Sequence, residues 1–196
     1  FLHHDGCLTE GSNSNLFAVI NDVVLTAPDH EVLAGVTRDV LMALARAAGR
    51  TVYLDLDFRA DQWHDLRAYG VTVRALLPLV DVVLGTEEEF RAAALESQAD
   101  VRIAHQQVSA PEVRGDLVRA MEGLRRRSPR AVFVVKRGAR GASVHLPDGG
   151  AIDAPGFPVA VVNVLGAGDA FAAGLIYGRT RGWGWRESAR LGNACG

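Results

Sequence analysis

Residues 161–178, VVNVLGAGDAFAAGLIYG, place two glycines and an aspartate between a β-branched run and a run of small residues. The β-branched residues favour a strand that ends near Val164, and the small residues favour a helix that begins near Gly168. Gly166, Ala167 and Gly168 then form the turn between them, which presents unpaired N–H groups where an anion is favoured. The stretch therefore predicts a strand, an anion-binding turn and a helix.

Asp169 lies in the first turn of this expected helix, beside the place where an anion would lie. A carboxylate in that position interacts favourably with the positive end of the helix dipole, and this structural role alone is enough to explain the aspartate. Alternatively, Asp169 is a catalytic base that takes a proton from a substrate hydroxyl while the N–H groups stabilise a transferring phosphoryl group. The four residues Gly-Ala-Gly-Asp by themselves leave both interpretations open.

Strand and helix patterns alternate along the rest of the chain. Short β-branched runs predict strands at 51–56, 80–85, 131–136 and 159–164, and helical patterns lie between several of them. This alternation predicts an α/β fold with a mainly parallel sheet that is covered on both faces. Because ligands gather at the carboxyl ends of such strands, motifs that directly follow a strand are the candidate site.

The amino-terminal part has a different pattern. Residues 16–25, LFAVINDVVL, contain two β-rich runs around Asn21-Asp22, a pair that tolerates a tight hairpin turn. Residues 36–48 then carry apolar side chains at helical spacing, and Gly49 is placed to end that helix. We expect a β-hairpin followed by a helix before the sheet begins.

Composition excludes several classes of protein. The chain has 196 residues, 48% of them hydrophobic, and a formal net charge of −2 without a basic stripe, so neither nucleic acid nor a membrane is an expected partner. Cys7 and Cys195 form no metal-binding or disulfide pattern, which fits a reducing cytoplasm. No apolar run reaches the roughly 18 to 20 residues that span a bilayer. We expect a soluble cytoplasmic protein.

Residues 49–196 resemble the ribokinase-like (PfkB) family of carbohydrate kinases, through the signature NVLGAGDAFAAG at 163–174. The resemblance implies a ribokinase-like three-layer sandwich, here with an incomplete sheet, in which the turn 166–168 is the anion hole. It implies that Asp169 is the catalytic base that contacts the substrate. Asn163-Val164 replaces the more usual Asp-Thr, and this variant resembles the branch that phosphorylates 5-dehydro-2-deoxygluconate in myo-inositol breakdown.

Two further stretches match family elements around the nucleotide. In GTEEEF (85–90), Glu89 matches the glutamate of an Asn-x-x-Glu element that orders Mg2+ through water, with Thr86 in place of the asparagine. Alternatively, the three acids only stabilise the start of a helix, because carboxylates in the first turn interact favourably with the helix dipole. In VVKRGARGA (134–142), the resemblance implies that Lys136, Gly138 and Gly141 adjoin ATP, although the pattern alone fits any hairpin turn.

Two other positions carry weaker matches. The stretch DLDFRADQW (55–63) resembles a segment of sugar-acid kinases, with Asp57 in place of an asparagine. Arg59 would then bind a substrate carboxylate or phosphate through its planar fork, or it forms a surface ion pair with Asp55 or Asp57. Asn193 lies in a helix that flanks the adenine pocket in this family.

The first 48 residues resemble another family, the fold-type IV aminotransferases, which use pyridoxal phosphate. The resemblance implies that Glu10 bonds the pyridine nitrogen and that Gly35, Val36 and Thr37 hold the cofactor phosphate. The cofactor also needs a lysine, and the single lysine of this chain, Lys136, belongs to the kinase-like part. We interpret the chain as a composite or fragment, with an aminotransferase-like segment at 1–48 and a kinase core at 49–196 that lacks a lid region and its carboxyl-terminal end.

These expectations combine into one principal function and two alternatives. The principal expectation is phosphorylation of a sugar or sugar acid with ATP and Mg2+, by in-line transfer to a hydroxyl. The alternatives are a fragment of a pyridoxal phosphate aminotransferase and a nucleotide-binding remnant without turnover. Small molecules are the expected partners, and the oligomeric state, including a homo-oligomer, stays open.

Overall fold

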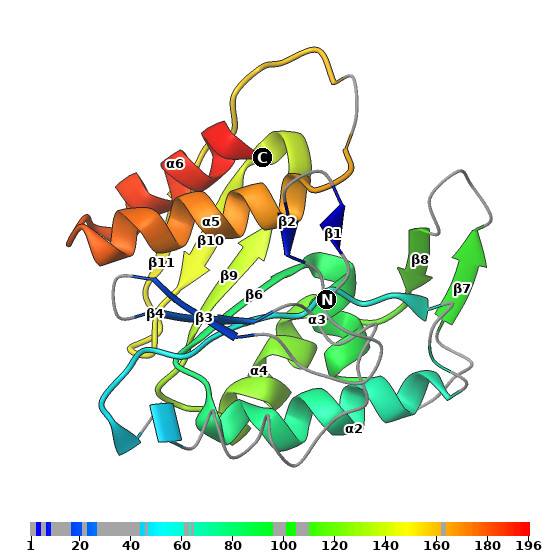
Figure 1. Cartoon of the computed structure of the whole chain (residues 1–196). Coiled ribbons are helices and arrows are strands. Elements are labelled where there is room, and N and C mark those ends of the chain that lie inside the picture. Colours follow the sequence, from blue (N-terminus) through cyan, green and yellow to red (C-terminus); the bar gives the residue numbers. More distant parts are fainter. Residues whose placement is uncertain are drawn as a thin grey trace.

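Five strands form a mixed sheet in the order β11–β10–β9–β6–β5 (Figure 1). The computed structural model describes residues 3–4, 7–8, 17–20, 23–26, 44–45, 47–60, 63, 65–95, 101–104, 110–161 and 164–196. The strands are β5 (Tyr53–Asp55), β6 (Val82–Thr86), β9 (Val132–Lys136), β10 (Ala142–His145) and β11 (Ala151–Ala154). β5, β6 and β9 are parallel, whereas β10 and β11 are antiparallel additions at one edge. Three of the four predicted strands are therefore present, and the sheet is mixed.

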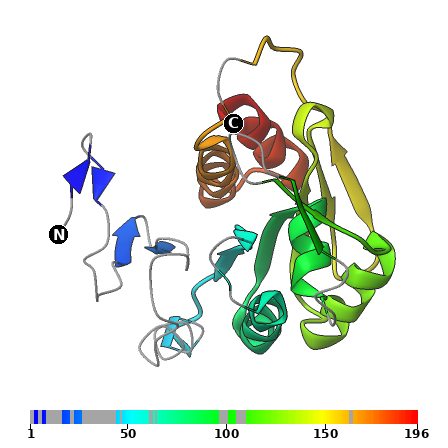
Figure 2. The same cartoon turned by 90° about the vertical axis from the view of Figure 1, so that its right-hand side faces the viewer.

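Helices cover both faces of this sheet, which confirms the α/β class and its three layers (Figures 1 and 2). One layer holds α2 (Leu66–Leu76), α3 (Glu87–Ala93) and α4 (Leu117–Arg127). The other holds α5 (Ala167–Thr180) and α6 (Trp185–Cys195), which pack against each other. Short 3-10 turns lie at Leu77–Leu79 and Gly138–Arg140. In the described part of the chain, no helix is long and apolar enough to span a membrane.

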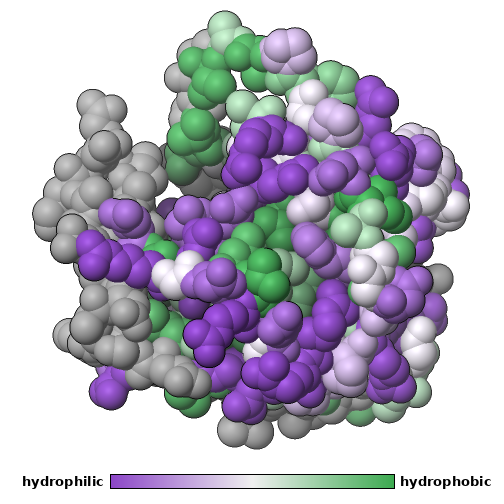
Figure 3. Space-filling model, turned by 180° about the vertical axis from the view of Figure 1, so that it is seen from behind, coloured by the Kyte–Doolittle hydropathy of each residue, from purple (hydrophilic) through white to green (hydrophobic). Residues whose placement is uncertain are grey.

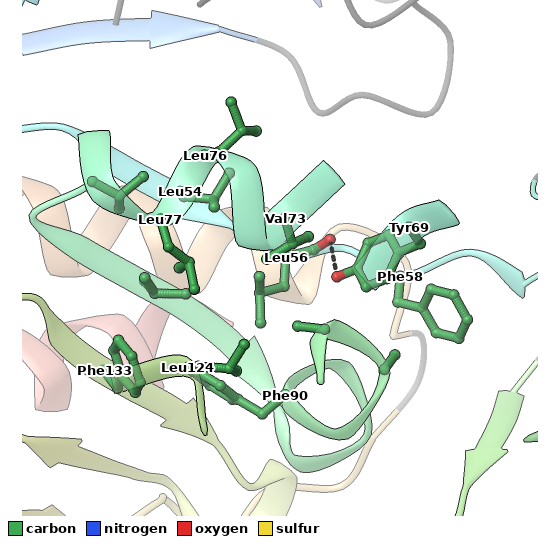
Figure 4. Close-up of a cluster of buried hydrophobic side chains, with 14 of the residues drawn as sticks. Leu54, Leu56, Phe58, Tyr69, Val73, Leu76, Leu77, Phe90, Leu124 and Phe133 are labelled. Atoms are coloured by element: carbon green, nitrogen blue, oxygen red, sulfur yellow. Dashed lines mark hydrogen bonds between the residues drawn. The ribbon is translucent and has the colours of Figure 1, made fainter. Parts of the chain in front are cut away.

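Alternating side chains of the strands build two cores, one on each face. In β9, Phe133 and Val135 belong to the core under α2, α3 and α4, while Val132 and Val134 belong to the core under α5 and α6. This alternation follows from the period of two residues in a strand. In the first core, the buried Tyr69 hydroxyl donates a hydrogen bond of 2.8 Å to the Leu56 carbonyl oxygen, so its one polar group is satisfied (Figure 4).

The amino-terminal hairpin is confirmed. β3 (Phe17–Ile20) pairs antiparallel with β4 (Val23–Thr26), with Ile20 opposite Val23, which leaves two residues for the turn. Two other antiparallel pairs, which the sequence patterns do not predict, are β1 (His3–His4) with β2 (Cys7–Leu8) and β7 (Val101–Ala104) with β8 (Ala110–Val113).

The helix expected at 36–48 is described only near its end, where Leu44, Ala45 and Ala47 are helical. The Arg50 N–H donates to the Ala45 carbonyl at 2.8 Å, a bond that closes a helix in the Schellman arrangement. That arrangement needs a left-handed residue, and Gly49 supplies it with φ of +69°. Gly49 therefore ends the helix as predicted.

The strand predicted at 159–164 is wrong for its described residues. Residues 159–161 and 164 lie outside the strands, and Val159, Val161 and Val164 are 74%, 68% and 60% exposed. β-branched residues favour a strand only where a neighbouring strand and a packed face receive them, and no described strand pairs with this segment. Residues 159–161 instead lie in the loop that projects at the top of Figure 1, and Figure 3 shows hydrophobic side chains at the top of the molecule.

Candidate functional site

Three charged side chains from separate elements meet at the carboxyl ends of the parallel strands. Asp55 ends β5, Lys136 ends β9, and Glu89 lies in the first turn of α3, directly after β6. The Lys136 ammonium (Nζ) donates to both Asp55 carboxylate oxygens, at 2.8 and 3.1 Å, and lies 3.8 Å from Glu89 Oε2. The three side chains are only 13 to 22% exposed, so this is a largely buried ionic cluster.

The start of α3 places Glu89. Thr86 is the N-cap residue, and it forms a capping box with Glu89: the Glu89 N–H donates to Thr86 Oγ1 at 3.2 Å, and the Thr86 N–H donates to Glu89 Oε2 at 2.6 Å. The same carboxylate oxygen faces Lys136. A side chain at Gly85 would lie 3.2 Å from that oxygen, so glycine leaves the carboxylate its room. Glu89 therefore caps the start of α3 and also faces Lys136.

Burial and neighbouring charges shift the pKa values of this cluster. Burial raises the pKa of Asp55, and the nearby carboxylates of Asp57 and Asp169 add to that rise, while Lys136 opposes it. Burial likewise raises the pKa of Glu89, against the effect of Lys136. For Lys136, burial lowers the pKa, but the carboxylates of Asp55 and Glu89 outweigh it and the pKa is raised. The ammonium is therefore firmly charged, and the acids around it outnumber it.

The excess of carboxylates over ammonium groups in this cluster favours a bound cation, but the positions of the side chains restrict how it could be bound. Among the residues that the structure describes, no three ligand side chains lie close enough together to hold a metal ion directly. Mg2+ keeps several waters and takes one or two carboxylates, so the carboxylates here fit a cation that completes its coordination with water and ligand oxygens. The residues present are thus compatible with a water-mediated magnesium site.

The glycine turn lies beside this cluster. Gly166 is the N-cap of α5 in the left-handed conformation, with φ of +77°, and provides no side-chain cap. The Ala167 N–H donates to the Val164 carbonyl at 3.2 Å, whereas the N–H groups of Gly168 and Asp169 belong to the helix's first turn, which lacks intrahelical acceptors. A Cβ at Gly168 would lie 3.4 Å from Lys136 Nζ, so the turn and the ammonium adjoin. Asp169, in the same first turn of α5, is exposed.

The second glycine loop follows β9. Gly141 has φ of +84°, and a side chain there would overlap the backbone at Ala154 and Gly156. Asn193 of α6 holds the same region, because its side-chain amide donates to the carbonyls of Ala154 at 2.9 Å and Pro155 at 3.1 Å. Gly141 and Asn193 thus both contact the backbone that follows β11, whereas Gly138 lies in the 3-10 turn before Gly141, with no atom within 4 Å of a Cβ placed there.

Arg59 takes the ion-pair alternative in this structure. Its Nε donates to Asp57 Oδ1 at 3.0 Å, and its side chain is 43% exposed. Asp57 itself has a positive φ of 34°, a conformation that aspartate tolerates better than most residues. Asp55 and Asp57 also line a hollow together with Trp63, Tyr69 and Thr72.

Sequence reasoning left Asp55 out of the site and placed it only as a partner of Arg59. The available signal was an acid at the end of the apolar run TVYLDL, at the strand edge where ligands gather. Its bond to Lys136 joins residues 81 positions apart, which no local pattern reveals. Glu10, Gly35, Val36 and Thr37, the pyridoxal phosphate candidates, lie outside the described residues.

Comparisons with known proteins agree on one family. The model of the pfkB family carbohydrate kinases matches residues 14–196, so it begins within the segment that resembles aminotransferases. Among curated proteins, the chain is 29% identical over 153 residues to the 5-dehydro-2-deoxygluconokinase of Shouchella clausii, covering 78% of this chain and 42% of the relative. It is 28% identical over 187 residues to the enzyme of that name from Photobacterium profundum, covering 93% and 50%.

Solved structures show the same fold. A PfkB protein from Polaromonas sp. JS666 has a TM-score of 0.61 at 28% identity, covering 85% of this chain and 48% of that protein. A fructokinase from Vibrio cholerae, solved with fructose, ADP and calcium, has a TM-score of 0.61 at 24% identity, covering 81% and 47%. The chain thus spans half or less of the length of these relatives and structures.

Proposed function

The chain belongs to the pfkB family of carbohydrate kinases, and we propose that its site transfers the γ-phosphoryl group of ATP to a hydroxyl of a sugar or sugar acid. One observation carries the proposal: the buried cluster of Asp55, Glu89 and Lys136 adjoins the open first turn of α5. Phosphoryl transfer needs a cation, hydrogen-bond donors for the equatorial oxygens and a base for the hydroxyl, and this edge of the sheet holds residues for all three.

Asp169 is the base in this proposal. Its exposed carboxylate at the start of α5 accepts the proton of the substrate hydroxyl. Next to it lie the N-cap Gly166 and the first two helical residues, Ala167 and Gly168, and N–H groups of this first turn of α5 donate to the oxygens of the transferred group. ATP, when bound, supplies that group.

Glu89 holds the metal side of the site. Its carboxylate would hold Mg2+ through water, and a bound metal would supply positive charge for the phosphate oxygens. The capping box with Thr86 fixes this carboxylate before any ligand arrives, which lowers the cost of organising the site. Thr86, which stands where the family element has an asparagine, forms this capping box through its hydroxyl.

The remaining candidates surround the nucleotide and the sugar. Gly138 and Gly141 let the backbone after β9 approach the nucleotide, Lys136 adjoins its phosphates, and Asn193 holds the neighbouring carbonyls in place. Arg59 would leave Asp57 for a substrate carboxylate, because an exposed ion pair is weak enough to be exchanged. In this proposal Arg59 contacts the substrate and Asp57 is its partner in the ligand-free protein.

We propose 5-dehydro-2-deoxygluconate as the substrate. The support is the name shared by several curated relatives and the Asn163-Val164 variant of the signature, together with an arginine suited to a sugar acid. The identity to these relatives is 29% or less, so a direct comparison of substrates must decide. Turnover of fructose or ribose in preference to the sugar acid would contradict this assignment.

Asp169→Asn tests the proposed base. The substitution keeps size and hydrogen bonding but removes the proton acceptor, so turnover should fall by about a thousandfold, within the range for a catalytic base. The affinity for MgADP, measured by titration calorimetry, should stay within about twofold because no nucleotide contact is lost. The matched control is Glu122→Gln, an exposed acid of α4.

Near-normal turnover of the Asp169→Asn protein would reject this role of Asp169. Nucleotide binding by a wild-type chain that turns over none of these sugars would favour the nucleotide-binding remnant instead. The calorimetric titration therefore separates a wrong base from a site that binds without transfer.

A further inference from the structure

Lys136 is held in a position that a helix by itself disfavours. Its ammonium adjoins Gly168, in the first turn of α5, where the helix dipole presents its positive end. A cation at that end is unfavourable unless anions accompany it. The carboxylates of Asp55 and Glu89 therefore offset the unfavourable position of this positive charge beside the N–H groups of the turn.

Asp55 is the residue that keeps it there. It binds the ammonium through both carboxylate oxygens, at 2.8 and 3.1 Å, while Glu89 lies at the longer distance of 3.8 Å and is already engaged by the Thr86 N–H. β6 lies between β5 and β9, so the bond between Asp55 and Lys136 spans two strand spacings at the carboxyl ends of these strands. Asp55 thus fixes the end of an otherwise flexible side chain.

We propose that Asp55 is a positioning residue: it holds the Lys136 ammonium beside the first turn of α5, ready to contact the terminal phosphate of bound ATP. The inference rests on the proposed function, and it adds a role for an acid that is neither base nor metal residue. A terminal phosphate bound there meets the ammonium and the turn N–H groups together. Asp55 acts on it only through Lys136.

The single lysine of this chain gives a direct measurement. Lysine labelled with 13C and 15N yields one set of side-chain NMR signals, all from Lys136. In the ligand-free protein, Asp55→Asn should move the signals of the side-chain end toward those of a mobile lysine. The control is Asp153→Asn, which removes the same charge from an exposed partner of Arg137. Unchanged signals in the Asp55→Asn protein would overturn the inference without reference to any ligand.

Nucleotides of different phosphate number test the contact itself. A charge-assisted hydrogen bond is worth about 1.5 to 3 kcal/mol, so Lys136→Met should weaken binding of a non-hydrolysable ATP analogue with Mg2+ by about tenfold or more. Asp55→Asn should weaken it by a smaller factor, about threefold to fivefold, because the cation remains but is less well placed. AMP binding should change by less than about twofold in both, since AMP lacks the terminal phosphates.

Two results would contradict the role of Asp55. Equal weakening of AMP and the ATP analogue would mean general damage to the site, and tighter binding of both would mean that Asp55 only repels anions. If Asp55 acts through Lys136, Asp55→Asn in the Lys136→Met protein should not change the ratio of the affinities for the ATP analogue and for AMP any further. Conservative replacement by Lys136→Arg should restore part of the preference for the ATP analogue.

The kinase function and the positioning role of Asp55 can be rejected separately. A wild-type chain that binds neither nucleotide contradicts the proposed function, and the ligand-free spectra of the Asp55→Asn protein then decide the hold on Lys136. If binding occurs but the Lys136 signals do not respond to the ATP analogue, the kinase proposal stands and the phosphate contact is rejected.

Discussion

At the scale of single residues, the site depends on one ammonium among several acids. Lys136 is 13% exposed and faces Asp55 and Glu89, whose carboxylates would otherwise be buried near each other without a counter-charge. Such a cluster is costly to assemble because each ion loses water, and it is more costly still when one partner is missing.

Lys136→Met should lower the free energy of unfolding by about 3 kcal/mol, because two buried acids lose their cation. Urea denaturation at neutral pH measures this value. The control is Arg140→Met, since Arg140 is 68% exposed and its 2.8 Å ion pair with Glu87 should contribute less than about 1 kcal/mol. An equal decrease in the free energy of unfolding in the two variants would mean that burial does not determine how much the Lys136 ion pairs contribute to stability.

At the scale of elements, glycines determine how closely α5 and α6 pack. A Cβ at Gly174 would lie 3.0 Å from the Gly192 Cα, and a Cβ at Gly178 would lie 2.9 Å from the Ser188 Cα. The two helices therefore meet backbone to backbone over the second core. Because α5 begins at the glycine turn, this packing also determines where Asp169 and the turn N–H groups lie.

Gly178→Ala should destabilise the protein by about 1 to 3 kcal/mol, the usual cost of overpacking. The matched control is Gly123→Ala in α4, where the new methyl group would meet only Arg126 Nη2 at 3.6 Å. There, better helix propensity should stabilise the protein by about 0.5 to 1 kcal/mol. Thermal and urea denaturation of both variants measure the difference, and stabilisation by Gly178→Ala would show that the helices have room to adjust.

At the scale of the whole molecule, the five-stranded sheet and its two helical layers form the part of the fold that carries the candidate site. All residues of the cluster lie at one edge of that sheet, where β5, β6 and β9 end. The chain spans half or less of the length of these relatives.

Ligand-dependent stability tests the kinase proposal against the aminotransferase alternative. MgATP at one hundred times its Kd should raise the free energy of unfolding by about 2.7 kcal/mol, because it binds only the folded state. Pyridoxal phosphate should produce no comparable rise. A side-by-side thermal titration measures both, with ATP and EDTA as the control for metal dependence. Stabilisation by pyridoxal phosphate alone would overturn the kinase proposal.

Features that depend on neighbours along the chain can be predicted from the local sequence. The glycine turn before α5, the strands around Leu54, Val83 and Val134, the hairpin at 17–26 and the helix end at Gly49 all follow from local propensity and φ preferences. The family signature is likewise a continuous stretch. Such features are readable because the residues that produce them are adjacent.

Other features depend on contacts between residues that are far apart in the sequence. The bond of Asp55 to Lys136 depends on the order of β5, β6 and β9, and the two carbonyl contacts of Asn193 depend on how α6 meets β11. The segment 159–164 carries strand-forming residues, yet its described residues stay outside the sheet because no described strand pairs with them. Propensity acts within a few residues, whereas strand order, register and burial join residues far apart, and those decide which charges meet.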